Sequence, residues 1–232
     1  MRLLTPERGV LTAFAFGGLR SRRRFSGCLE PLSRVLFKIV RQRGAGYYFL
    51  REGSLLDRFS GLHRDPGRLG MAVNCTKFVE AAHAGSDDSR AVYSLLTRTL
   101  AALEDEGRIP GHLPLFFRSR LACEYGYRPE LGICSACGGS VLSGDRAELS
   151  LSRGAVRCSS CDFLRDGYVV KPQVLACMQQ VLDSDPSQWS DLSRRWEGAL
   201  RQSCLLLERF VEYHLALVWD AGRFRPAGSV AG

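Results

Sequence analysis

The first part of the chain carries the short, alternating hydrophobic pattern of β-strands. In residues 9–18 every second side chain, from Val10 to Phe16, falls on one face of the segment, and glycines bound it. Two further short runs, residues 33–40 and 47–52, are rich in β-branched and aromatic residues and are separated by a glycine-containing turn. Short strands joined by such turns predict a small all-β unit.

After about residue 66 the apolar residues recur at helical spacing, so the pattern predicts a helical domain over residues 67–232 behind a β domain over residues 1–66. Proline or aspartate stands near several predicted starts, and glycine near several predicted ends. The predicted helices cover residues 69–82, 88–106, 114–125, 172–182 and 190–219, the last with a break at Gly198. The fold class predicted from this order is α+β.

Four of the nine cysteines form the pattern Cys134-x2-Cys137-x20-Cys158-x2-Cys161. Each Cys-x2-Cys turn aims two thiolates at one point, and a hairpin over residues 147–151 and 155–158 would bring the two turns together. The spacing favours one Zn²⁺ per chain. Four sulfur ligands leave no open position for water, so the zinc is expected to be structural. A redox Cys-x-x-Cys pair is the alternative reading.

The positive charge of the chain is concentrated at its amino-terminal end. The formal net charge is +8, whereas residues 1–68 alone carry 14 Lys and Arg against five Asp and Glu. This asymmetry predicts a polyanion partner, with nucleic acid first. The candidate phosphate contacts lie in two turns of the β unit: Arg20, Arg22, Arg23, Arg24, Arg41 and Arg43. The alternative is that these arginines only form a solvated charged face without a ligand. Aromatic residues interleave with these arginines, and on a small barrel they either stack on bases or form the core.

Several function classes find no support in the sequence. It contains no Gly-Lys-Ser/Thr phosphate loop, no Gly-x-Ser-x-Gly, no His-Glu-x-x-His and no Gly-x-Gly-x-x-Gly, so we expect no enzyme. The longest run without a charged residue, Leu131–Gly144, has 14 residues, which is too short for a membrane span. The first residues lack the apolar core of a secretion signal, so the expected location is the cytoplasm.

The chain resembles the zinc-bearing members of the RecO family, which are bacterial DNA repair and recombination mediators. The resemblance lies in Phe116–Leu121, Tyr125–Leu131, Cys134–Gly139 and the second cysteine pair, and more loosely in Leu3–Gly9, Gly17–Arg24 and Leu29–Leu32. It implies an OB-fold barrel followed by a helical domain with an inserted zinc ribbon at residues 130–165. The family has another strand before the segment that matches Leu3–Gly9. Either the true start therefore lies upstream or this barrel lacks its first strand.

The resemblance also implies a function and a set of partners. The implied activities are binding single- and double-stranded DNA, annealing complementary strands and assisting RecA loading on DNA coated by single-strand binding protein. The implied protein partners are RecR and single-strand binding protein, and the implied location is the nucleoid. Two other function classes stay open. A protein-binding adaptor would have arginines that are only solvated, and it would not bind DNA at low salt. A thiol oxidoreductase would carry a reactive thiolate in one of the Cys-x-x-Cys pairs.

Overall fold

The computed structural model describes residues 1–21, 23–41, 44, 46–82, 89–104, 107, 109–162 and 167–227. They form two compact units. The first comprises Met1–Thr76 with the described part of His83–Glu106, and the second comprises Lys77–Ala82 with the described part of Gly107–Gly232. This grouping does not test the predicted domain boundary after residue 66, which stays a prediction. Among the described residues, no helix combines the length and the apolar content needed to cross a membrane.

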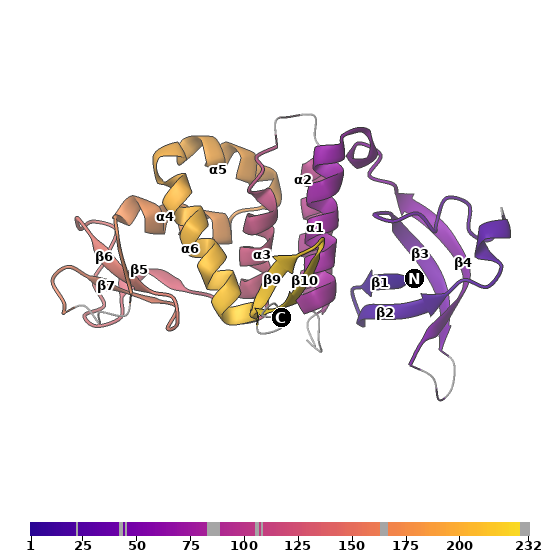
Figure 1. The fold of residues 1–232 in the computed structure, drawn as a ribbon, viewed down its shortest axis with the longest axis horizontal. Helices are drawn as coiled ribbons and strands as arrows, with labels where there is room; N and C mark the ends of the chain where they lie inside the picture. Colours follow the sequence, from indigo (N-terminus) through magenta and orange to yellow (C-terminus); the bar gives the residue numbers. More distant parts are fainter. Residues whose placement is uncertain are drawn as a thin grey trace. The chain divides into compact units, whose positions relative to one another are not determined.

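The first unit is built on a four-stranded sheet with strand order β1-β2-β4-β3 (Figure 1). Its strands are β1 (Arg2–Thr5), β2 (Gly9–Phe14), β3 (Arg34–Arg41) and β4 (Tyr48–Asp57). Neighbours β1 and β2 are antiparallel, β2 and β4 parallel, and β3 and β4 antiparallel. Over the described residues β1 and β3 are the two edges, so the sheet is OB-like but not closed into a barrel. This agrees with the predicted α+β class with an OB-like amino-terminal sheet.

Alternation along the strands places one face of this sheet on a small core. The buried residues of the core are Ala13, Phe25, Cys28 and Leu50. Partly buried side chains from β3 and β4, among them Phe37 and Tyr48, pack against it. Alternate positions of β2 therefore point to solvent, where Phe14 is 44% exposed. The aromatic residues predicted as either core or surface are thus divided between the two.

Helix α2 (Ser89–Glu104) and the first part of α1 (Pro66–Ala82) complete the first unit. The apolar stripe predicted for α2 is buried, including Val92, Leu95 and Leu103. Two hydrogen bonds fix its carboxyl end: Gly61 N donates to Glu104 Oε1 over 2.8 Å, and the Arg68 guanidinium donates to Leu103 O over 3.0 Å. Short 3-10 turns lie at Gly18–Arg20 and Leu62–Arg64.

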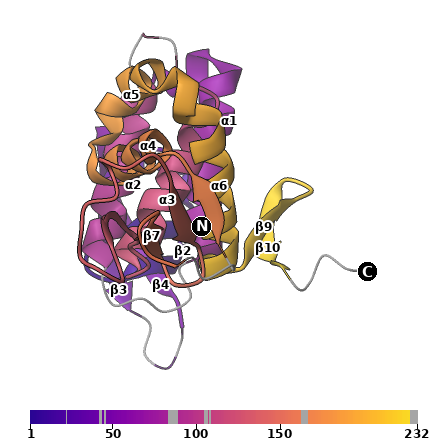
Figure 2. The same ribbon diagram turned by 90° about the vertical axis from the view of Figure 1, so that its left-hand side faces the viewer.

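The second unit has a helical core, in which α3, α4 and α6 pack side by side (Figure 2). Its helices are α3 (Leu113–Glu124), α4 (Pro172–Asp183), α5 (Trp189–Arg195) and α6 (Glu197–Leu215), with a 3-10 turn at Pro186–Gln188. Trp189 is fully buried, its ring packs at 6.0 Å from Phe116, and its indole N–H donates to Val181 O over 3.3 Å. This bond satisfies the one polar atom of the largest core side chain.

The predicted long helix over residues 190–219 is wrong in two respects. The break falls at Trp196 and not at Gly198, because the Trp196 backbone leaves the helical region and its indole N–H donates to Gln180 Oε1 over 2.9 Å. The helix then ends at Leu215, because Ala216 adopts a left-handed conformation with φ 49°. The following residues form a hairpin of β9 (Leu217–Asp220) and β10 (Arg223–Pro226).

A second four-stranded sheet, the ribbon, is inserted between α3 and α4. Its strands are β5 (Glu130–Cys134), β6 (Ala147–Ser150), β7 (Ala155–Cys158) and β8 (Tyr168–Val170), in the order β5-β7-β6-β8. Strands β6 and β7 form the predicted hairpin, which turns through Gly154 at φ +60°. Because β5 runs parallel to β7, the carboxyl ends of both strands lie at the same edge of the sheet. Both cysteine pairs begin at these ends.

Candidate metal centre and nucleic-acid interface

The first cysteine pair sits in a tight turn at the end of β5. Cys134 is the last residue of the strand, and Gly138 N donates back to Cys134 O over 2.9 Å. Cys134 N in turn donates to Gly139 O over 2.8 Å. Gly138 has φ +72°, a conformation that side chains disfavour, so glycine is the residue this turn requires. The turn directs the Cys137 thiol back toward Cys134.

The second pair sits in an equivalent turn at the end of β7. Cys158 is the last residue of that strand, and Cys161 N donates to Cys158 O over 3.1 Å. The two turns are held together by backbone hydrogen bonding, since Ser135 N donates to Val156 O over 2.8 Å. Backbone hydrogen bonds therefore help to place both pairs.

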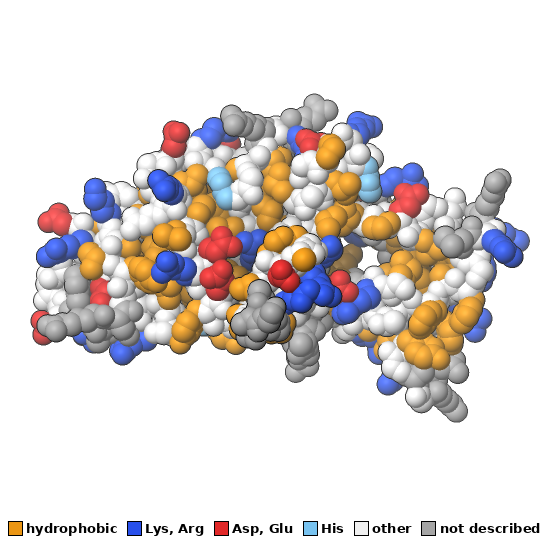
Figure 3. Space-filling model, viewed as in Figure 1, with side chains coloured by type: hydrophobic (Ala, Val, Ile, Leu, Met, Phe, Trp, Pro, Cys, Tyr) orange, Lys and Arg blue, Asp and Glu red, His pale blue; other side chains and the backbone are white. Residues whose placement is uncertain are grey.

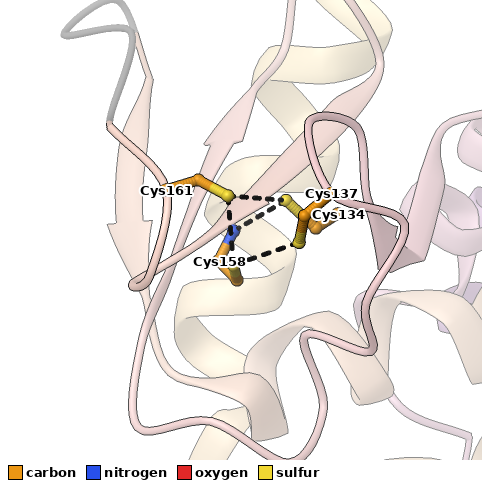
Figure 4. Close-up of side chains that lie close together, drawn as sticks. All are labelled: Cys134, Cys137, Cys158 and Cys161. Atoms are coloured by element: carbon orange, nitrogen blue, oxygen red, sulfur yellow. Dashed lines mark hydrogen bonds between the residues drawn. The ribbon is translucent and has the colours of Figure 1, made fainter.

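The four thiols converge on one point between the turns (Figure 4). Their sulfur atoms all lie within 4.8 Å of one another. The sulfur–sulfur distances are 3.9 Å for Cys134–Cys161, 3.8 Å for Cys137–Cys158 and 3.6 Å for Cys158–Cys161. Four sulfurs placed tetrahedrally at ~2.3 Å from an ion would be about 3.8 Å apart, so the set could hold a metal ion of that type. That these residues do ligate a metal stays a prediction.

The pKa values within the cluster show how its thiols would respond to a cation. The backbone N–H of Cys158 donates to Cys134 Sγ over 3.3 Å and lowers the pKa of Cys134 to about 6. Hydrogen bonds with the thiols of Cys158 and Cys137 raise the pKa of Cys161 to about 12. Metal binding requires thiolates, so a bound cation would release the proton that Cys161 retains without it.

Burial is the main influence on the cysteines outside the cluster. Burial raises the pKa of Cys123 and of Cys204 to about 11, and it also raises the pKa of Cys177. Cys28 and Cys75 are buried. Buried cysteines of this kind behave as small apolar side chains.

The predicted phosphate-binding arginines are exposed wherever the structure describes them. Arg20 ends a 3-10 turn, Arg23 and Arg24 follow it, and Arg41 ends β3. Arg22 and Arg43 lie outside the described residues. Within the described chain, none of these four arginines forms an ion pair with a carboxylate, unlike Arg58, whose Nε lies 3.7 Å from Glu30 Oε2. Their contact with DNA stays a prediction.

Arg24 is the best-anchored of the four described arginines. Its guanidinium donates to Phe16 O over 2.9 Å and to Ser21 Oγ over 3.2 Å, and it lies 5.2 Å from the centre of the Phe25 ring. These contacts hold the side chain in place while leaving it exposed. A fixed guanidinium loses little conformational freedom on contacting a phosphate.

Aromatic residues beside these arginines were noted in the sequence, but their roles were left undecided. Phe14, Phe16 and Tyr47 are exposed, and together with Phe49 they form a cluster of touching rings. In a space-filling view, hydrophobic side chains gather on the surface of the four-stranded sheet of the first unit, with Lys and Arg near them (Figure 3). Strand alternation was the signal for their exposure, since it separates Phe14 from the buried Ala13 and Tyr47 from the core-facing Tyr48.

An open OB-like sheet followed by a helical unit with a four-cysteine ribbon defines a two-part α+β protein with a candidate metal ribbon. The family model described as Recombination protein O N terminal matches residues 1–59, and Recombination protein O C terminal matches residues 63–221. The chain belongs to the RecO family, as its motifs predicted.

Curated relatives agree over nearly the full chain. The DNA repair protein RecO of Maridesulfovibrio salexigens is 39% identical over 226 residues, which cover 97% of this chain and 91% of the relative. That of Solidesulfovibrio magneticus is 40% identical over 227 residues, covering 97% and 90%. That of Rubrobacter xylanophilus is 31% identical over 202 residues, covering 86% and 79%.

Proposed function

We propose that this protein is a non-catalytic mediator of DNA repair and recombination. It binds single- and double-stranded DNA, anneals complementary strands and assists RecA loading on strands coated by single-strand binding protein, with RecR as a further partner. Membership of a family whose relatives are named DNA repair proteins supports the repair role. The observation that supports DNA binding is a set of exposed arginines in the first unit, Arg20, Arg23, Arg24 and Arg41, which form no ion pair with a carboxylate among the described residues.

The proposed mechanism is electrostatic. Guanidinium groups match the planar geometry of phosphate oxygens, and each contact releases condensed counterions from the nucleic acid. Such contacts tolerate any base sequence, as a mediator of general repair requires. Annealing then needs no nucleotide hydrolysis. Screening the charge of two strands at one basic surface lowers their mutual repulsion and raises their local concentration.

The proposed metal is Zn²⁺, held by Cys134, Cys137, Cys158 and Cys161. A set of four converging thiolates suits zinc, which four sulfur ligands surround with no position left for a reacting water. A bound Zn²⁺ would offset part of the charge of the four thiolates, and Cys134 and Cys158, which end β5 and β7, would both hold it. The convergence of both pairs on one point also favours a metal site over a redox role, for which a single pair suffices.

Binding of a labelled single-stranded oligonucleotide across a salt series tests this proposal. For single strands, the slope of log affinity against log salt is roughly −0.7 per neutralised phosphate, so four arginine contacts predict about −3. Replacing Arg20, Arg23, Arg24 and Arg41 by alanine should remove most of that slope. Arg58→Ala is the matched control, because Arg58 is exposed in the same unit but already paired with Glu30.

The outcomes separate the proposal from its rivals. A folded variant, checked by circular dichroism, with a flattened slope supports binding through the two basic turns. Absence of binding by the unaltered protein at low salt would overturn the proposal in favour of a protein-binding adaptor. An equal loss in Arg58→Ala would mean that net charge alone, and not these positions, attracts the DNA.

A further inference from the structure

Four aromatic side chains form a closed ring of contacts on the solvent side of the first unit; we call this set the aromatic platform. The centroid distances are 6.5 Å for Phe14–Phe16, 5.1 Å for Phe16–Phe49, 5.6 Å for Phe49–Tyr47 and 5.0 Å for Tyr47–Phe14. Phe14 and Phe16 are nearly parallel, with 24° between their planes, whereas Tyr47 stands edge-on to both of its neighbours. Each ring is therefore braced by two others.

The platform is not part of the core. In the parallel pairing of β2 with β4, Ala13 is paired with Tyr48, and both lie on the core face of the sheet. The next pair, Phe14 and Phe49, lies on the opposite face. Phe16 is 68% exposed, a large fraction for an aromatic side chain. Singly exposed apolar residues are ordinary, but a contiguous exposed aromatic cluster marks a binding surface.

Positive charge lies beside the platform. The Arg24 guanidinium donates to the carbonyl oxygen of Phe16, which fixes an exposed cation beside that residue. Arg24 forms no ion pair with a carboxylate within the described part of the chain. Apolar π-faces next to a fixed cation are complementary to a ligand with flat apolar groups on an anionic backbone.

We propose that the aromatic platform stacks on unpaired bases of single-stranded DNA, with Arg24 contacting a neighbouring phosphate. This rests on the proposed function and assigns the bases to particular residues. In a duplex the base faces are already stacked and hidden, so the platform favours single strands. Because the rings brace one another before binding, little side-chain freedom is lost when a base stacks on them.

The test compares three probes of one length: a deoxythymidine oligonucleotide, an abasic oligonucleotide with the same phosphates, and a duplex. Phe16→Ala removes the most exposed ring without touching the core. It should weaken binding of the deoxythymidine strand by roughly tenfold or more, from the usual contribution of base–aromatic stacking. Binding of the abasic strand and of the duplex should change less than about twofold, and the salt slope should stay the same, since no phosphate contact is removed.

Two variants serve as controls. Leu36→Ala removes another strongly exposed apolar side chain, 65% exposed, from β3 of the same sheet but outside the platform, and should leave all three affinities unchanged. Phe16→Trp keeps a flat ring and should retain tight binding of the deoxythymidine strand. Recovery by tryptophan separates stacking from a merely structural role of Phe16.

Three results would overturn the proposal. An equal loss of affinity for the normal and the abasic strand in Phe16→Ala would show that the ring acts through the phosphate contacts, while DNA binding itself would stand. A dimer by sedimentation that Phe16→Ala dissociates would show that the platform joins two copies of the chain. Failure of the unaltered protein to bind any probe would remove the proposed function and the platform with it.

Discussion

His214 on α6 donates a hydrogen bond from Nε2 to the main-chain carbonyl oxygen of Leu151, 2.9 Å away, at the turn between β6 and β7. The carbonyl can only accept, so Nε2 carries a proton. Aromatic rings surround the imidazole, with Phe210 at 4.5 Å and Tyr127 at 4.9 Å between ring centroids. The contact joins the helical core of the second unit to the hairpin that presents Cys158.

Replacing His214 by phenylalanine should loosen the ribbon. The ring packing is kept, but Leu151 O loses its donor, and the expected cost is about 1 kcal/mol in free energy of unfolding. Amide hydrogen exchange should quicken in residues 151–154, and metal content should stay the same. Tyr213→Phe, a change at an exposed neighbour on α6, is the control. Unchanged stability and unchanged amide exchange in His214→Phe would show that this hydrogen bond does not stabilise the ribbon.

Gly154→Ala should destabilise the same hairpin. Gly154 has φ +60°, and an added Cβ would lie 3.5 Å from Pro129 Cα, so the cost comes from backbone strain and is expected at about 1 kcal/mol. Gly144→Ala, at a ribbon glycine without positive φ, should cost less. Chemical denaturation of both variants measures the difference. Equal free energies of unfolding would argue against strain at residue 154.

Cys158→Ser should abolish stoichiometric metal binding, because three thiolates and a hydroxyl form a much poorer zinc site. Metal analysis of the purified protein should give one zinc per chain in the unaltered protein and far less in the variant. A chelator should lower the melting temperature of the unaltered protein only, since metal binding contributes folding free energy. The control is Cys123→Ser, outside the cluster. Equal zinc content in Cys158→Ser would refute the ligand assignment.

His112 should make stability depend on pH. Its Nε2 lies 2.7 Å from Ser193 Oγ, and burial lowers its pKa below the ordinary value of 6.5. The unfolded chain therefore binds a proton more readily than the folded one. The contribution is fully present above pH 6.5 and is lost as the pH falls through the lowered folded pKa.

Denaturation at about pH 7.5 and about pH 5.5 checks this prediction. The drop in unfolding free energy should be smaller in His112→Gln, which has no charge to gain. Acid also protonates the cluster thiolates, but that effect is common to both proteins and cancels in the comparison. An identical drop in both would mean that His112 titrates normally.

The sequence allowed some parts of this fold to be predicted because their signals are local. Cysteine spacing predicted the convergence of four thiols, since two-residue spacings constrain the turns at Cys134 and Cys158 directly. Apolar periodicity located α2 and α4 for the same reason. Motifs around Phe116 and Tyr125 pointed to the RecO family, which supplied the OB-type topology that no local pattern encodes.

Other features depend on tertiary context. The sequence after Ser190 carries no helix-ending signal at Leu215, where the helix stops. The left-handed Ala216 instead permits a hairpin, whose Phe224 packs at 4.8 Å from Phe78 on α1. Likewise, the pattern along β2 separates two faces but does not say which one is covered. Only the position of Phe25 and Leu50 in the core showed that Phe14 points to solvent.

The most direct test of the proposed function is the rate at which complementary labelled oligonucleotides anneal, measured without any nucleotide. The unaltered protein should accelerate annealing at low salt, and the acceleration should fall as salt rises. The variant lacking Arg20, Arg23, Arg24 and Arg41 should anneal strands at the protein-free rate while remaining folded. Annealing at the protein-free rate by the unaltered protein, with both strands bound, would contradict the account.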